Sequence, residues 1–205
     1  MSACASLSDA VLALSRGDAV IFPTDTVYGL GVAVEAAEGP DVLYRLKERD
    51  RGKPIAWLVA SPVDLDRYGV DVPALARLLA ARFWPGPLTL IVHASDKVPE
   101  AFRSDTNTIG LRMPASTTAL ELIKRVGCPL ATTSANISGH PSPRSFASID
   151  PTLAVRVDVV LGDEGDDDKS GIASTVVDCT ASPLRIVREG VVTADDIAAL
   201  ARELS

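Results

Sequence analysis

The sequence has few of the residues on which covalent catalysis and metal binding usually depend. Only two of its 205 residues are histidines, His93 and His140, and neither stands at a metal-ligand spacing. The three cysteines form no CxxC pair, and the GxSxG nucleophile elbow is absent. The sequence therefore argues against a tightly bound zinc ion, a disulfide framework and a covalent mechanism. It favours an enzyme that positions its substrates and neutralises charge.

Long apolar runs are also missing. None approaches the ~20 residues that a membrane-spanning helix needs. The N-terminal stretch MSACASLSDAVLALSRGD has no cationic region ahead of its apolar residues, and Asp9 and Arg16 interrupt them. This stretch predicts a helix and not a signal peptide. We expect a cytoplasmic protein with reduced cysteines and no membrane association.

Basic residues are outnumbered by acidic ones. The 20 lysines and arginines and 27 aspartates and glutamates give a formal net charge of −7. Nucleic-acid binding over a broad surface needs a cationic face, which this composition disfavours. An anionic ligand would need a local basic pocket.

Short apolar runs alternate with helical patterns along the whole chain, with no linker, repeat or change of composition. This alternation predicts one α/β domain over residues 1–205, built on a sheet that is at least partly parallel. We expect a helix from a cap near Ser6 to Gly17, and further helices over 41–47, 73–83, 117–126 and 194–204. The expected strands are 19–22, 55–59, 88–92, 108–111, 129–133, 157–161, 174–178 and 184–187.

Two polar stretches directly follow predicted strands, where ligands bind by default in such folds. The first is the glycine-punctuated turn TDTVYGLG (24–31), and the second is the loop of small polar residues over 132–143. Hydroxyls, an amide and backbone N–H groups there could bind a phosphate or a nucleoside. Both stretches could equally be ordinary turns without a ligand.

Cations alternate between residues 45 and 53. On an extended segment, Lys47, Arg49, Arg51 and Lys53 would share one side and could converge on a triphosphate. The alternative is a solvated charged surface.

Two arginines end predicted strands and pose a similar choice. Arg112 closes the strand over 108–111, and Arg188 follows the strand over 184–187. Each could hold a ligand's carboxylate or form a structural salt bridge with one of the many acids.

Seven segments together resemble the YrdC-like threonylcarbamoyl-AMP synthases. They occur in the family's order and span residues 22–190, so their combination is far more specific than any one of them. The segments are FPTDTVYGLG (22–31), the K-x-R of 47–49 with KP at 53–54, WPGPLTLIV (84–92), TIGLRMP (108–114), the S-x-N of 134–136 inside TSANISGHPS, STVVD (174–178) and IVREG (186–190).

The resemblance implies a twisted mixed sheet flanked by helices around a large concave basic cavity. It also implies the short, single-domain form of the family, without an additional C-terminal domain. The implied reaction joins ATP, L-threonine and bicarbonate into threonylcarbamoyl-AMP and pyrophosphate, with Mg²⁺ carried by the nucleotide. A downstream threonylcarbamoyl-transferase complex would then modify the tRNA adenosine next to the anticodon.

The resemblance also assigns roles to individual residues. The implied threonine ligands are Thr26, Arg112 and Ser174. The K-x-R and S-x-N tetrad, implied to be catalytic and to face the phosphates and the carbamate, is Lys47, Arg49, Ser134 and Asn136. The implied nucleotide ligands are Arg49, Lys53, Thr108, Thr132, Ser134, Ser142 and Arg188.

One residue departs from the family pattern, and three other functions stay open. Asp50 stands where the family usually has a proline after K-x-R, which puts an acid beside the expected phosphate cluster.

The same cavity could serve an RNA-binding or ribosome-maturation module, with weak RNA binding. An enzyme handling an acyl or carbamoyl phosphate and a nucleotide-binding domain without activity are further alternatives.

Overall fold

One mixed β-sheet organises the molecule. The computed structural model describes residues 5–52, 54–162 and 169–203, so Lys53 and most of the acidic stretch 163–169 lie outside the described residues. Within the described part, nine strands follow one another in the order β10-β9-β5-β6-β3-β7-β2-β1-β8, and β4 pairs with β5. The pairs β1–β8, β3–β6 and β5–β9 are parallel, and the other pairs are antiparallel. The predicted partly parallel sheet is therefore confirmed.

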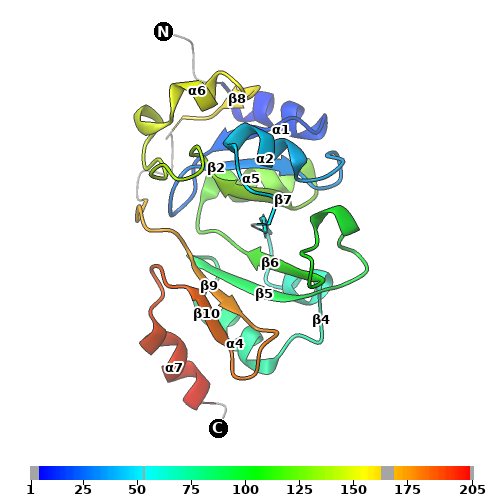
Figure 1. Cartoon of the computed structure of the whole chain (residues 1–205), viewed down its shortest axis with the longest axis vertical. Coiled ribbons are helices and arrows are strands. Elements are labelled where there is room, and N and C mark those ends of the chain that lie inside the picture. Colours follow the sequence, from blue (N-terminus) through cyan, green and yellow to red (C-terminus); the bar gives the residue numbers. More distant parts are fainter. Residues whose placement is uncertain (1–4, 53, 163–168, 204–205) are drawn as a thin grey trace.

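The sheet has two halves joined by β3 (Ala56–Leu58), which pairs with β7 on one side and β6 on the other. The first half-sheet contains β1 (Val20–Phe22), β2 (Gly29–Ala33), β7 (Leu130–Ser134) and β8 (Val159–Val160). Its helices are α1 (Leu7–Ser15), α2 (Asp41–Lys47), α5 (Thr117–Val126) and α6 (Pro151–Ala154), all in the upper part of Figure 1.

The second half-sheet forms the lower part of Figure 1. It contains β4 (Gly69–Val70), β5 (Leu88–Ala94), β6 (Thr108–Arg112), β9 (Thr175–Asp178) and β10 (Arg185–Arg188). Its helices are α3 (Asp64–Tyr68), α4 (Ala74–Phe83) and α7 (Ala194–Arg202), with 3₁₀ turns over Glu100–Phe102 and, in the other half, Phe146–Ser148.

Local capping sets the limits of the longer helices. Ser6 and Asp9 form a reciprocal capping box at the start of α1. The buried Ser116 hydroxyl accepts from the N–H of Ala119 at the start of α5 and also donates to the carbonyl of Pro23. Gly127, with φ of 84°, ends α5 in the left-handed conformation that glycine adopts without strain. The Ser116 contact also fixes α5 against the end of β1.

The glycines of TDTVYGLG lie in a strand and not in a loop. The sequence predicts a turn over 24–31, but β2 begins at Gly29, so the second part of that prediction is wrong. β2 pairs with β7, and a Cβ at Gly31 would lie 2.9 Å from the Thr132 hydroxyl oxygen. A Cβ at Gly29 would meet the same threonine at 3.0 Å. Glycine here leaves room for a side chain from the neighbouring strand.

The apolar core extends through both half-sheets. Trp57 on β3 is fully buried, and its ring meets Tyr68 and Phe102 edge to face, with centroids 5.2 and 5.6 Å away. No helix of the described residues is long and apolar enough to cross a membrane.

Candidate functional site

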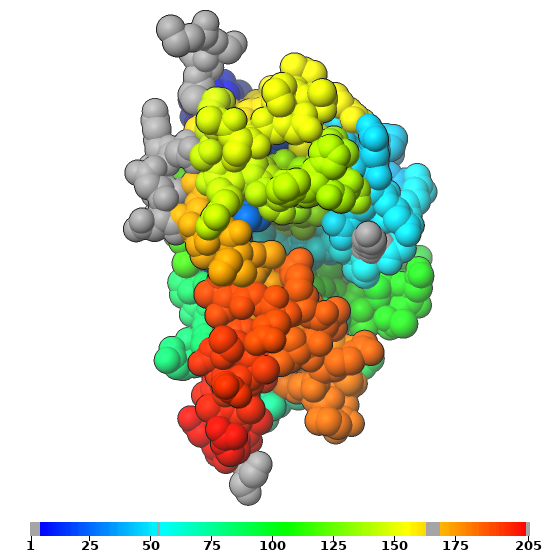
Figure 2. Space-filling view, turned by 60° about the vertical axis from the view of Figure 1, so that its left-hand side comes forward, coloured from blue at the N-terminus to red at the C-terminus, as the bar shows by residue number. Residues whose placement is uncertain are grey.

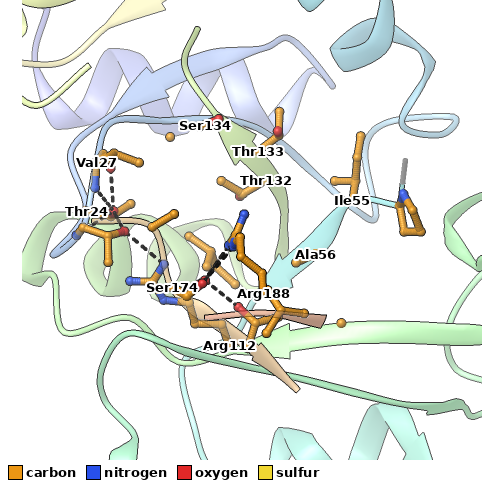
Figure 3. Close-up of a pocket in the computed structure, with 18 of the residues that line it drawn as sticks. Thr24, Val27, Ile55, Ala56, Arg112, Thr132, Thr133, Ser134, Ser174 and Arg188 are labelled. Atoms are coloured by element: carbon orange, nitrogen blue, oxygen red, sulfur yellow. Dashed lines mark hydrogen bonds between the residues drawn. The ribbon is translucent and has the colours of Figure 1, made fainter. Parts of the chain in front are cut away.

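A cavity of about 250 Å³ lies where the two half-sheets meet. Figure 3 shows Thr132, Thr133 and Ser134 of β7 on one side of it, and Arg112, Ser174 and Arg188 on the other. Apolar groups from β3, β5 and β6, including Ala56, complete the wall. Side chains that are more than a hundred residues apart in the sequence therefore face the same space.

Arg112 ends β6 and is almost completely buried in this wall. Its Nη2 lies 2.6 Å from the carboxylate of Asp25, its Nη1 donates to Thr26 Oγ1 at 3.1 Å, and its Nε donates to the carbonyl of Gly86 at 3.1 Å. Burial lowers the pKa of the guanidinium, and the Asp25 carboxylate opposes that shift. Arg112 is thus both a salt-bridge partner, as one sequence interpretation expects, and a cavity residue.

Arg188 reaches the cavity from β10. Its Nε and Nη2 donate to the carbonyl of Ser174 at 3.0 and 2.8 Å, and Nη2 also donates to Ser174 Oγ at 3.1 Å. Burial lowers the pKa of Arg188, and the nearby charges of Arg112 and Arg49 lower it further. The charges of two other arginines therefore reach Arg188 at this site, an accumulation of positive charge that suits a negatively charged ligand.

Arg49 supplies the third guanidinium, from the segment after α2. Its Nη1 donates to Thr133 Oγ1 at 3.1 Å, and its Nη2 donates to the carbonyl of Pro54 at 3.3 Å. Burial lowers its pKa, against an opposing effect of Tyr44. The described residues that line the cavity include no aspartate or glutamate, so a ligand there meets guanidinium groups without a competing acid in the lining.

Lys47 lies behind the cavity wall and not on it. Its side chain is buried, and its ammonium donates to the carbonyls of Ser134 and Asn136 and to Asn136 Oδ1, the last two at 2.5 and 3.1 Å. The carbonyl of Lys47 in turn accepts from the N–H of Ser138 at 2.9 Å. Burial and the charge of Arg49 lower the pKa of the ammonium to about 7. Lys47 thereby joins the end of α2 to the loop after β7.

Asn136 holds that loop together from within. Its Oδ1 accepts from Ser134 Oγ at 2.5 Å, and its Nδ2 donates to the carbonyls of Ile137 and His140 at 2.9 and 2.7 Å. The Ser142 hydroxyl lies 3.5 Å from the same Oδ1. The amide therefore fixes the shape of the loop that presents Ser134 and Ser142 to the cavity.

The expected convergence of four alternating cations is wrong for Arg51. Its guanidinium lies outside the main cavity, 3.4 Å from the carboxylate of Asp41, and is mostly exposed. Asp50 Oδ1 accepts from the N–H of Gly52 at 3.0 Å and does not line the cavity. The chain turns sharply after Arg49, so alternate residues do not stay on one side.

The structure brings most of the predicted site residues together. Nine of them line the cavity: Thr26, Arg49, Thr108, Arg112, Thr132, Ser134, Ser142, Ser174 and Arg188. Lys47 and Asn136 support the loop from behind, and Lys53 lies outside the described residues.

Sequence reasoning missed one buried polar residue of the wall, Thr89, and included Thr24 only as part of the turn over 24–31. Thr89 stands inside the apolar run of β5 and is 4% exposed, yet its hydroxyl lies 2.9 Å from Ser174 Oγ. Thr24 is equally buried and donates to the carbonyl of Val27 at 2.6 Å. A hydroxyl within an apolar run was the available signal, but such residues are common in ordinary strands.

Two segments meet beside the cavity. The N–H groups of Ser170 and Gly171 donate to the carbonyls of Asp25 and Thr26 at 3.0 and 2.8 Å. Arg144 donates to the carbonyl of Ser170 at 2.9 Å, and Figure 2 shows the chain near residue 145 against the chain near residue 170. These contacts hold the segment before β9, and with it Ser174, next to the turn that carries Thr26.

The fold and the cavity define an α/β protein with a polar, arginine-containing cavity between the halves of one mixed sheet. The sequence profile of the family described as telomere recombination, that of the Sua5, YciO and YrdC proteins, matches residues 12–190. The chain belongs to this family.

Relatives within the family differ in length. The threonylcarbamoyl-AMP synthase of Pyrococcus abyssi is 35% identical over 90% of this chain, which spans about half (54%) of that protein. The threonylcarbamoyl-AMP synthase of Xanthomonas campestris pv. campestris strain B100 is 33% identical over 92% of this chain and 97% of its own length.

Solved structures agree with the fold. The crystal structure of P. abyssi Sua5 complexed with L-threonine superposes with a TM-score of 0.88 and 34% identity, over 95% of this chain and 56% of that one. E. coli YciO gives a TM-score of 0.80 at 26% identity, over 90% and 89% of the two chains. The predicted α/β class, with a mixed sheet flanked by helices, is therefore confirmed, and the large concave basic cavity stays a prediction.

Proposed function

We propose that this chain is an L-threonylcarbamoyladenylate synthase. It joins ATP, L-threonine and bicarbonate into threonylcarbamoyl-AMP and pyrophosphate. The observation that carries the proposal is the convergence of nine residues from distant segments, three of them arginines, on a single cavity without a described carboxylate in its lining. The names of the relatives support the same activity.

L-Threonine would lie against Thr26, Arg112 and Ser174. Two hydrogens remain on the Nη atoms of Arg112 after its bonds to Asp25 and Thr26, and these can bind the substrate's carboxylate. The two hydroxyls then face the rest of the amino acid. A relative of the same fold was solved in complex with L-threonine, which supports L-threonine as the ligand.

The nucleotide would occupy the side of the cavity between Arg49, Arg188 and the loop that presents Ser134. The guanidinium groups of Arg49 and Arg188 neutralise phosphate charge, and Thr108, Thr132 and the Ser142 hydroxyl bind the nucleotide. Lys47 and Asn136, proposed members of the catalytic set, act by holding Ser134 in place. The part of Lys53 in nucleotide binding stays a prediction.

Magnesium would enter with the nucleotide. The described residues contain no group of three or more His, Cys, Asp or Glu side chains that could hold a metal ion, and the lining offers hydroxyls and arginines. These donors do not form a protein metal site, so we assign Mg²⁺ to the phosphates of ATP as part of the substrate.

The reaction has two stages. The amine nitrogen of threonine bonds to the carbon of bicarbonate, and water leaves, giving a carbamate. A carbamate oxygen then attacks the α-phosphorus of ATP and displaces pyrophosphate. Negative charge grows on the phosphoryl oxygens in this transition state, and the guanidinium of Arg49 stabilises it. A downstream threonylcarbamoyl transferase, in the cytoplasm with its tRNA substrate, would consume the product.

Incubation of the pure protein with ATP, labelled bicarbonate and single amino acids tests the proposal. We expect pyrophosphate release and a labelled adenylate with L-threonine, and little with valine, because a site built to bond a hydroxyl rejects an analogue that lacks it. Valine as effective as threonine would remove the assigned specificity. Salt-dependent RNA binding without ATP consumption would favour the RNA-binding alternative instead.

A further inference from the structure

The hydroxyl of Ser174 has two neighbours that determine the direction of its own hydrogen bond. Arg188 Nη2 donates to Ser174 Oγ at 3.1 Å, because a guanidinium has no acceptor. The hydroxyl of Thr89 lies 2.9 Å from the same oxygen, and by distance alone either hydroxyl could be the donor. The surroundings of Thr89 decide which one donates.

Thr89 has one place to send its hydrogen. Its side chain is 4% exposed, and among the described residues Ser174 Oγ is the hydrogen-bond partner of its hydroxyl. If Ser174 donated to Thr89, the Thr89 hydrogen would have no acceptor among the described residues, which is costly for a hydroxyl that is so deeply buried. Counting donors and acceptors therefore makes Thr89 the donor. Both lone pairs of Ser174 are then occupied, and its own hydrogen is left for the cavity.

The hydroxyl of Thr26, which contacts Arg112, is fixed in the opposite sense, as an acceptor toward a ligand. The Thr24 hydroxyl donates to the carbonyl of Val27 at 2.6 Å, so Thr26 must be the donor in the 3.1 Å contact between the two threonines. Thr26 Oγ1 also accepts from Arg112 at 3.1 Å. One lone pair is left on Thr26, which faces a ligand as an acceptor.

We propose that the buried Thr89 is a positioning residue that makes Ser174 a hydrogen-bond donor toward the amino-acid substrate, while Thr24 makes Thr26 an acceptor. The inference rests on the proposed function. An amino acid with a hydroxyl offers acceptors in its carboxylate and hydroxyl and donors in its ammonium and hydroxyl. The two fixed hydroxyls therefore recognise complementary atoms of one substrate, with no reorientation cost on binding.

Thr89→Val tests the role because it keeps the shape of the side chain and removes the hydrogen donated to Ser174. We expect the KM for L-threonine to rise about tenfold, the effect of one lost hydrogen bond, with the KM for ATP unchanged. Thr89→Ser, which keeps the hydroxyl, should restore the wild-type KM. Thr89→Cys, a weak donor, should give an intermediate value and replaces the valine variant if that variant does not fold.

The inference is overturned by an unchanged threonine KM in Thr89→Val, or by equal increases in the KM values for threonine and ATP. A Thr89→Ser enzyme as impaired as Thr89→Val would also contradict it. Calorimetric titration of each variant with L-threonine gives a readout that does not require turnover. If the wild-type protein releases no threonine-dependent pyrophosphate, the proposed function fails, while the titration still tests Thr89.

Discussion

The Arg49 guanidinium contacts the Thr133 hydroxyl at 3.1 Å and lines the cavity. In the proposed reaction it stabilises charge that develops on the phosphoryl group. Removing one such group typically lowers the rate by about 10²–10³-fold. We expect Arg49→Ala to lose threonine-dependent pyrophosphate release to this extent, with an unchanged circular dichroism spectrum.

Arg51→Ala is the matched control for this variant. Arg51 lies two residues further along, is mostly exposed and pairs only loosely with Asp41, at 3.4 Å. The Arg51→Ala variant should keep wild-type activity, because exposed ion pairs contribute little to stability and the Arg51 side chain is outside the main cavity. Equal losses in both variants would mean that the segment as a whole, and not the Arg49 charge, matters.

The buried ammonium of Lys47 makes stability depend on pH. Its pKa is about 7 in the folded protein, against 10.5 for a free lysine. Between these values the unfolded chain binds more protons than the folded chain, so the free energy of unfolding rises as pH rises. We expect this rise in urea unfolding curves measured from pH 7 to 8.5, and a smaller rise in Lys47→Met.

The upper pH limit of that experiment avoids an opposing effect of the cysteines. Burial raises the pKa of Cys179 to about 12, against 9 for a free thiol, so its contribution to stability falls above pH 9. The free energy of unfolding could instead stay constant from pH 7 to 8.5 in the wild type, or rise equally in Lys47→Met. Either result would contradict the assigned effect of this lysine.

At the level of single residues, the family resemblance named residues from strands, from a helix end and from loops, and nine of them line one cavity. The resemblance did not separate side chains in the wall from side chains behind it. Lys47 and Arg49 are two residues apart, yet one supports the loop and the other lines the cavity. That difference depends on the left-handed Glu48, with φ of 52°, which no periodicity reveals.

Among the elements, those with clear start and stop residues were predicted best. The predicted helix over 117–126 matches α5 at both ends, because Ser116 and Gly127 are strong caps. The short elements α3, β4 and α6 were missed, since two to five residues do not complete a recognisable period. Their formation depends on contacts made by the rest of the fold.

The segment after β10 packs closely at Gly190 against the start of β9. A Cβ there would collide with the carbonyl oxygen of Ala173 and lie 2.8 Å from the carbonyl carbon of Ser174. The N–H of Gly190 also donates to Thr175 Oγ1 at 2.9 Å. Overpacking of this kind costs about 1–3 kcal/mol. We expect Gly190→Ala to lose that much stability in urea unfolding and to raise the KM for threonine, because Ser174 must move.

Gly52→Ala provides the comparison for this prediction. The nearest atom to a Cβ at Gly52 is Asp50 Oδ1, at 3.5 Å, which is ordinary van der Waals contact. The variant should unfold at the wild-type urea concentration. A Gly190→Ala protein as stable as Gly52→Ala would show that the segment after β10 can move away from Ala173 and Ser174 without cost. Ser174 would then need no fixed position.

The whole molecule carries its site between two half-sheets that are joined through β3. Arg49 and Ser134 belong to the first half, and Arg112, Ser174 and Arg188 belong to the second. Ligands that contact both halves bind only the folded chain and not the unfolded chain. Their binding free energy therefore adds to the free energy of unfolding. At one hundred times the dissociation constant, this contribution is about 2.7 kcal/mol.

For a chain of this size, each kcal/mol raises the melting temperature by roughly 2–4 °C. We therefore expect an increase of roughly 5–10 °C with saturating L-threonine and an ATP analogue that has a methylene group between the α and β phosphorus atoms, which blocks turnover. Arg49→Ala should lose mainly the part due to the nucleotide, and Arg112→Gln mainly the part due to threonine. A full shift with the analogue in Arg49→Ala would place the phosphates elsewhere.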